Sequence, residues 1–185
     1  EYYRAWQESQ IFCVQMELCT GGTLRHVMSR DAAVLREPSS EQRVWEIILH
    51  LCRGLQHIHG YHVIHCDLKP ENILVSSDGA FKIGDLGQAT YLQAWDEHEG
   101  DARYLSRDLL EAHPSTAADI FSFGALAYEC FYYRANGEDF YEGMNLFTGL
   151  DVFRAPVTSD PQQMPERPSA CQDDAIWKCL CDCLT

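Results

Sequence analysis

The run His65-Cys66-Asp67-Leu68-Lys69-Pro70-Glu71-Asn72 places an imidazole, a carboxylate, an ammonium group and an amide within eight residues. Two short apolar runs follow, residues 73–75 and 81–83, and the Ser-Ser-Asp-Gly sequence between them has the chemistry of a tight hairpin turn. A hairpin of that length returns the chain to where it started, so Asn72 is expected beside Asp85 of Asp85-Leu86-Gly87. Two converging oxygen ligands could share metal ions there.

The order of these residues resembles the catalytic centre of a protein kinase, with His-x-Asp-Leu-x-x-x-Asn and then Asp-x-Gly. Each half alone is weak, because a lone Asp-x-Gly is usually a loop and a lone His-x-Asp a solvated turn, but the two in this order are specific. The resemblance implies an ATP-dependent phosphotransferase that uses Mg²⁺. By that resemblance Asp67 takes the proton of the substrate hydroxyl, and Lys69 stabilises charge on the transferring phosphate. Asn72 and Asp85 hold magnesium, and His65 supports the loop.

Composition and charge restrict the class of protein and its partners. The chain has 185 residues, 46% of them hydrophobic, which fits one globular domain, and no apolar run approaches the length of a membrane span. A formal net charge of −14 argues against nucleic acid as a partner, because phosphate contacts need clustered Lys and Arg. A protein substrate with a basic or neutral surface is compatible with that charge.

The nine cysteines have no paired spacing and follow no signal sequence, which favours reduced thiols and a location in the nucleus or cytoplasm. The spacing Cys179-x-Cys181-x-Cys183 does not match common zinc motifs, so we expect no metal site there, nor at the histidines of residues 57–62. Because the first residue is Glu1 and not Met, we expect a piece of a longer polypeptide.

The first 24 residues read as two strands, 1–6 and 11–16, followed by a glycine turn into a helix. In a protein kinase this region is the hinge between the lobes, where extended backbone binds the edge of adenine. The resemblance makes Met16 the gatekeeper. The resemblance also implies that backbone groups of Glu17 and Cys19 bind the adenine, and that Leu74 forms the apolar floor beneath the base.

The remaining helices are predicted from hydrophobic periodicity. One helix begins with the capping-box spacing of Ser39 and Gln42 and ends at Gly60, with an apolar stripe between. The stripe consists of Val44, Ile47, Ile48, Leu51, Leu55 and Ile58. The other helices are expected at residues 24–28, 117–133, 136–147 and 173–184.

Asp119 lies at the start of the apolar helix predicted for residues 117–133. A buried carboxylate is costly unless it is hydrogen-bonded, and the kinase resemblance makes it the acceptor of backbone N–H groups from the catalytic loop. The alternative is an ordinary Asp in the first turn of a helix, favoured by the helix dipole.

The predicted fold class is therefore α+β, a partial protein-kinase domain over residues 1–185. Residues 87–108 would be the activation segment, in which Asp108 of Ser106-Arg107-Asp108 replaces the usual Glu of Ala-Pro-Glu. The given residues lack the Gly-rich loop, the third-strand Lys and its Glu partner, so this piece alone is expected to be inactive. Its expected parts are the end of the small lobe (1–16), the hinge (17–23) and a mainly helical, C-terminally truncated large lobe (24–185).

Several stretches narrow the resemblance to the Wee/Myt family of mitotic inhibitor kinases. That family phosphorylates an inhibitory tyrosine, and in the Myt branch also a neighbouring threonine, of a mitotic cyclin-dependent kinase and so delays mitotic entry. The stretches are Tyr2-Tyr3-Arg4-Ala5-Trp6, residues 15–24, residues 83–90 with Leu86 in place of Phe, Glu99-Gly100-Asp101-x-Arg103-Tyr104-Leu105, and residues 136–140.

Two other functions remain open. A serine/threonine kinase of the translation initiation factor-two α subunit has a similar Gln-Met-Glu-x-Cys hinge, but Leu86 and residues 99–105 speak against it. A catalytically dead scaffold with a kinase-shaped surface is opposed by the presence of every expected polar residue of the catalytic centre. The substrate that becomes labelled separates these possibilities.

Cys66 replaces the Arg that most kinases use to pair with a phosphate on the activation segment. A neutral thiol cannot make that pair. The sequence therefore predicts that phosphorylation of the segment is not needed, and that internal ion pairs such as Asp101 with Arg103 hold it instead.

Overall fold

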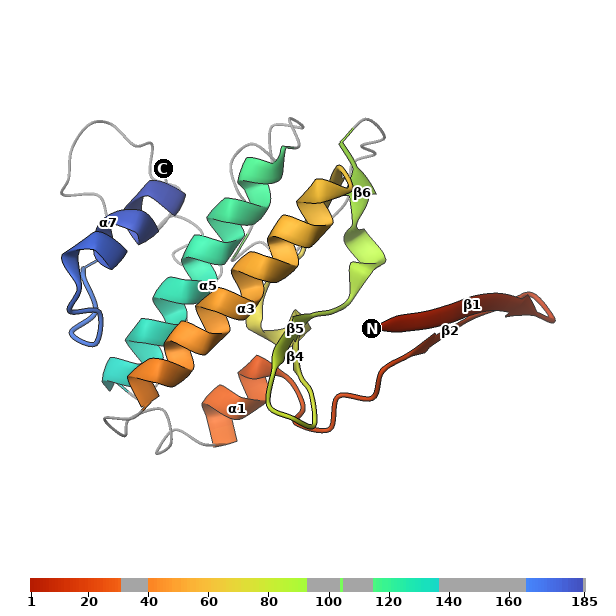
Figure 1. Cartoon of the computed structure of the whole chain (residues 1–185), viewed down its shortest axis with the longest axis horizontal. Coiled ribbons are helices and arrows are strands. Elements are labelled where there is room, and N and C mark those ends of the chain that lie inside the picture. Colours follow the sequence, from red (N-terminus) through yellow and green to blue (C-terminus); the bar gives the residue numbers. More distant parts are fainter. Residues whose placement is uncertain (31–39, 93–103, 105–114, 137–165, 185) are drawn as a thin grey trace, which may run out of the picture.

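The computed structural model describes residues 1–30, 40–92, 104, 115–136 and 166–184 (Figure 1). Its elements are β1 (Tyr2–Glu8), β2 (Ile11–Met16), α1 (Leu24–Arg30), α3 (Ser40–Gly60), β3 (Val63–Ile64), η1 (Pro70–Asn72), β4 (Ile73–Val75), β5 (Phe81–Ile83), η2 (Leu86–Gln88), β6 (Thr90–Tyr91), α5 (Thr116–Asn136) and α7 (Asp174–Cys183). The long helices α3 and α5 lie side by side, with α7 against α5 (Figure 1). The strands form three antiparallel pairs, β1–β2, β3–β6 and β4–β5.

Helix α3 confirms the predicted apolar stripe and ends at Gly60, as the sequence predicts. Its buried members pack in one core cluster with side chains of α5, the β4–β5 hairpin and α7. Ser39, the expected cap, lies outside the described residues. The stripe residues that are no more than 3% exposed are Val44, Ile47, Leu51 and Leu55.

The predicted hairpin is confirmed as β4–β5, in which Ile73 lies opposite Ile83. Gly79 takes the positive φ of +84° that the turn requires, a conformation that costs glycine little. At the open end, the backbone N–H of Gly84 donates to the carbonyl of Asn72 at 2.8 Å. The hairpin thus returns the chain to the residue from which it left, as the sequence predicts.

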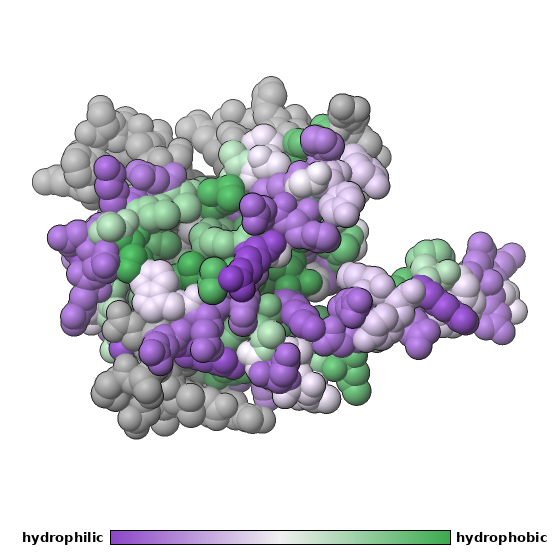
Figure 2. Space-filling model, in the orientation of Figure 1, coloured by the Kyte–Doolittle hydropathy of each residue, from purple (hydrophilic) through white to green (hydrophobic). Residues whose placement is uncertain are grey.

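The β1–β2 hairpin extends away from the helical body (Figure 1). Its surface is mixed, with hydrophobic and hydrophilic residues side by side on the face shown in Figure 2. Tyr3 is 56% and Phe12 is 72% exposed, so large apolar side chains of the hairpin lie uncovered among the described residues. Both strands agree with the sequence prediction, and β1 runs two residues further than expected.

The segment after β2 is attached to the β4–β5 hairpin by backbone hydrogen bonds. The N–H of Gly21 donates to the carbonyl of Val75, and the N–H of Val75 donates to the carbonyl of Gly22, both at 2.9 Å. In addition, Lys82 Nζ lies 2.6 and 2.7 Å from the two carboxylate oxygens of Glu17. These contacts attach the segment that follows β2 to the β4–β5 hairpin.

Helix α5 spans three residues more than predicted at its C-terminal end and is buried along most of its length. Two of its buried residues, Asp119 and Glu129, are acidic and 0% exposed. Helix α7 agrees with the prediction and is capped by Asp173, whose carboxylate accepts from the N–H groups of Ala175 and Ile176. The helix expected at residues 136–147 falls almost entirely outside the described residues. None of the described helices is long and apolar enough to span a membrane.

Candidate active site

The catalytic-loop motif lies between β3 and β4, and α5 holds its backbone. The buried carboxylate of Asp119 accepts a hydrogen bond from the N–H of His65 at 2.9 Å and another from the N–H of Cys66 at 3.0 Å. His59 Nε2 of α3 lies 2.8 Å from the same carboxylate. These three contacts anchor the start of the loop to the two central helices.

His65 ties the loop to the residue before Asp85. Its imidazole is 0% exposed, and Nε2 lies 2.9 Å from the carbonyl oxygen of Gly84. Since a carbonyl can only accept, Nε2 carries the proton, and Nδ1 then accepts from the N–H of Asp67 at 3.3 Å. One imidazole therefore positions both the backbone of Asp67 and the end of β5.

Asp67, Lys69 and Asn72 form a contiguous polar group. Lys69 Nζ lies 3.0 Å from Oδ2 of Asp67. The side-chain amide of Asn72 donates to the same Oδ2 at 2.7 Å and to the Asp67 carbonyl at 2.8 Å. Because Nδ2 of Asn72 makes both of these bonds, the other atom of the amide, Oδ1, is not used by Asp67 and can serve as a ligand oxygen.

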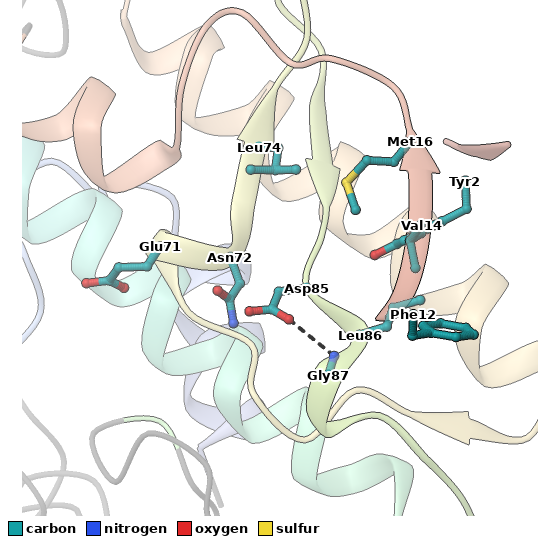
Figure 3. Close-up of a pocket in the computed structure, with 10 residues that line it drawn as sticks. All are labelled: Tyr2, Phe12, Val14, Met16, Glu71, Asn72, Leu74, Asp85, Leu86 and Gly87. Carbon is teal, nitrogen blue, oxygen red and sulfur yellow. Dashed lines mark hydrogen bonds between the residues drawn. The ribbon is translucent and has the colours of Figure 1, made fainter. Parts of the chain in front are cut away.

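Asp85 is held in the left-handed conformation with φ 54° and ψ 76°, which Asp tolerates better than most residues. Its Oδ1 accepts from the N–H of Gly87 at 3.2 Å. Figure 3 shows the side chains of Asn72 and Asp85 next to each other at the same cavity. The structure therefore brings together the two oxygen ligands that the motif spacing predicts.

The side-chain oxygens of Asn72 and Asp85 suit magnesium better than a metal ion whose ligands all come from the protein. Among the described residues no group of three or more His, Cys, Asp or Glu side chains could hold a metal ion. Magnesium bound with a nucleotide needs only one or two carboxylates, since phosphate oxygens and water complete its coordination. The donor set of Asn72 and Asp85 fits that chemistry.

A cavity of about 590 Å³ opens between the first hairpin and the β4–β5 end, in the size range of small-ligand sites. Met16 and Leu74 line its apolar part, and Asn72 and Asp85 line its polar part (Figure 3). The other residues that line it are Tyr2, Phe12, Val14, Glu71, Leu86 and Gly87.

Several predicted site residues lie elsewhere. Glu17, Cys19, Asp67 and Lys69 are not among the residues that line this cavity, although Asp67 is hydrogen-bonded to Asn72, which lines it. The proposed adenine contacts of Glu17 and Cys19 therefore stay predictions. Asp108 lies outside the described residues.

Cys66 is 4% exposed and adopts a positive φ of 64°. Burial, together with the nearby carboxylates of Asp119 and Asp67, raises the pKa of its thiol to about 12. The thiol is therefore protonated and unreactive at neutral pH. Among the described residues it packs with Ile64 and Ala118.

Sequence reasoning did not find a buried ionic cluster beside this site. Arg25 of α1 donates from Nη1 to Glu129 at 2.6 Å, from Nε to Glu71 at 3.0 Å and from Nη2 to the hydroxyl of Tyr104 at 2.9 Å. The Tyr104 hydroxyl donates to the other Glu129 oxygen at 2.6 Å. Burial alone would lower the pKa of Arg25, but Glu129 and Tyr104 outweigh it and raise the pKa. A charged Glu129 inside the predicted apolar helix was the one sequence signal for this cluster.

The chain belongs to the protein kinase family: the model of the protein kinase domain matches residues 1–182. Among known proteins it is similar to a probable protein kinase of Dictyostelium discoideum, with 38% identity over 129 residues, which are 68% of this chain and 36% of the relative. The predicted resemblance to a protein kinase is confirmed.

The narrower resemblance is also confirmed, as distant homology to the Wee/Myt kinases. The mitosis inhibitor protein kinase wee1 of Schizosaccharomyces pombe is 35% identical over 135 residues, 70% of this chain and 15% of the relative. A membrane-associated tyrosine- and threonine-specific cdc2-inhibitory kinase of Caenorhabditis elegans is 34% identical over 128 residues, 67% of this chain and 18% of the relative. The matched regions thus span well under half the length of these relatives.

Proposed function

We propose that this chain is the catalytic part of a Wee-type protein kinase, which transfers the γ-phosphoryl group of ATP to an inhibitory tyrosine of a mitotic cyclin-dependent kinase. The observation that carries the proposal is the arrangement of Asp67, Asn72 and Asp85. The amide of Asn72 binds the carboxylate suited to proton transfer, that of Asp67, and Asn72 lies beside Asp85, the carboxylate suited to magnesium, at a cavity large enough for a nucleotide.

Asp67 is the residue that receives the proton of the attacking hydroxyl. Its carboxylate is fixed by the amide of Asn72, and its backbone N–H is fixed by His65. Phosphoryl transfer depends mainly on positioning and on charge stabilisation, so a fixed acceptor is what the reaction needs from the protein. Lys69, 3.0 Å from the same carboxylate, places its positive charge where the phosphoryl group meets the hydroxyl.

Asn72 and Asp85 would hold magnesium through their side-chain oxygens, and the ion would supply charge neutralisation for the phosphates. The apolar walls at Met16 and Leu74 would enclose the adenine. In this proposal residues 1–16 end the small lobe, residues 17–23 are the hinge, and the helices belong to the large lobe. ATP, Mg²⁺ and a protein substrate are then its partners.

The assignment to the Wee type is supported by the names and similarity of the relatives. Two of them are described as mitosis-inhibitor and cdc2-inhibitory kinases.

The test uses the full-length protein with ATP and a purified mitotic cyclin-dependent kinase, and it asks which residue acquires phosphate. The expected product is phosphotyrosine on that kinase. D85N is expected to abolish labelling, whereas D78N, the same substitution at the exposed turn of the β4–β5 hairpin, leaves it unchanged. Labelling of the initiation factor-two α serine instead would refute the Wee assignment, and no labelling of either would favour a scaffold.

A further inference from the structure

Arg25 lies at the centre of a cluster of side chains that takes no part in the proposed phosphoryl transfer. Glu71, Glu129 and Tyr104 surround its guanidinium group, and we call these three residues the acidic cage. The cage contacts all three guanidinium nitrogens, at 3.0, 2.6 and 2.9 Å. A planar fork of donors matched by carboxylates is the geometry by which proteins recognise an arginine side chain.

The acidic cage lies beside the proposed acceptor site. Glu71 precedes Asn72, whose amide contacts Asp67, and Glu71 also lines the cavity (Figure 3). Neighbouring Cα atoms are about 3.8 Å apart, and an extended peptide advances about 3.3 Å per residue. A substrate whose hydroxyl lies at Asp67 therefore passes the cage within a few residues of its acceptor.

The cage needs a cation. Glu129 is 0% exposed, and a buried carboxylate is strongly unfavourable without a well-placed positive partner. A substrate arginine could supply that charge, but this chain supplies it from α1. The Arg25 side chain is 19% and the Glu71 side chain 36% exposed, so the rim of the cage is accessible to solvent.

We propose that Arg25 is a specificity-determining residue, which fills an arginine-binding site beside Asp67 from inside the chain, so that the kinase accepts substrates with no basic residue near the acceptor. The inference rests on the proposed function, since it concerns the protein substrate of the same site. It predicts that the charge preference of the enzyme is set by Arg25 and not by the catalytic residues.

The test compares the full-length wild-type protein with R25A on one tyrosine peptide and on variants in which Arg replaces each of the three residues on either side of the acceptor. For the wild type, kcat/KM is expected to change by less than about threefold across the set. R25A is expected to prefer an Arg-containing peptide at one position by about tenfold or more, equivalent to ~1.4 kcal/mol. R53A, the same substitution at an exposed position of α3, is expected to behave as the wild type.

R25A/E129Q controls for loss of structure, because it removes both the guanidinium and the buried charge. This double variant is expected to fold and to show no preference for Arg. A wild type that already favours Arg by tenfold, or an R25A protein without any new preference, overturns the proposal.

Binding of methylguanidinium provides a readout that does not depend on catalysis. This ion is expected to raise the melting temperature of R25A at millimolar concentration, and to leave that of the wild type and of R25A/E129Q unchanged. No shift for R25A overturns the proposal. If the wild type phosphorylates none of the peptides while methylguanidinium still binds R25A, the proposed function fails and the arginine site stands.

Discussion

The D119N substitution tests whether Asp119 anchors the catalytic loop. The wild-type carboxylate accepts the N–H groups of both His65 and Cys66 in a site that is 0% exposed. An asparagine of the same shape offers one oxygen acceptor and turns its NH₂ group toward the other N–H, so one buried backbone donor loses its partner. An unpaired buried donor costs about 1–3 kcal/mol, and the loss of charge from the remaining hydrogen bonds adds to this, for a total of about 2–4 kcal/mol.

At about 2–4 °C per kcal/mol for a domain of this size, the melting temperature should fall by about 4–16 °C. The amide protons of residues 65 and 66 should also exchange with solvent faster in the full-length variant, because one of them loses its acceptor and the other keeps only an uncharged one. Thermal unfolding by circular dichroism measures the first effect, and hydrogen exchange with mass spectrometry measures the second.

D174N is the matched control, since Asp174 lies in the first turn of α7, is 94% exposed and forms a surface ion pair with Arg167. A first-turn Asp stabilises a helix by about 0.3–1 kcal/mol through the helix dipole. If D119N costs no more than D174N and leaves the exchange of residues 65 and 66 unchanged, the anchoring role is wrong and the dipole explanation is right.

Three further predictions use other parts of the structure. G21A should destabilise the protein by about 1–3 kcal/mol in urea unfolding, because an added Cβ would lie 2.7 Å from Val75 Cβ and 2.9 Å from its carbonyl oxygen, whereas G60A, with nothing within 4 Å, should be neutral or slightly stabilising. A thiol-alkylating reagent at pH 7.5 should modify the exposed Cys179 and spare Cys66. Burial raises the folded-state pKa of Cys66 to about 12, so the stability that its protonated thiol contributes is present below pH 9 and is lost as pH rises toward 12. Labelling of Cys66 below pH 9 in the folded protein would contradict this protection of the thiol. Phosphatase treatment of the full-length enzyme should leave turnover unchanged, because Cys66 cannot pair with a phosphate; a large loss of turnover would refute that hypothesis.

The parts of the fold that follow local rules were predictable from the sequence. Helix α3 follows from the spacing of Val44, Ile47 and Leu51, and the β4–β5 hairpin follows from the Asp-Gly turn at Gly79. Each of these features depends on residues that are close together in the sequence. The proximity of Asn72 and Asp85 follows in turn from the hairpin, and was therefore predictable as well.

The acidic cage was not predictable because its contacts join distant segments. Arg25 and Glu129 are separated by 104 positions, and Arg25 and Tyr104 by 79. An arginine on a short helix usually indicates a solvated surface, and only the packing of α1 near α5 makes it the partner of a buried carboxylate. Arg25 and Glu129 lie on separate predicted helices, and the hydrophobic periodicity of neither helix indicates that the two side chains are in contact.

Helix α5 holds the catalytic loop at two separate points along its length. Asp119 binds the backbone at the start of the loop, and Glu129 reaches the end of the loop through Arg25 and Glu71. With a rise of 1.5 Å per residue, the two carboxylates are about 15 Å apart along the helix axis, a span that a single anchor could not fix. Because each carboxylate is buried and bonded to more than one group, rotation or sliding of α5 would break several hydrogen bonds at once. The two anchors therefore hold both ends of the loop that carries Asp67 against one helix, and His65 and Asn72 position Asp67 within that loop.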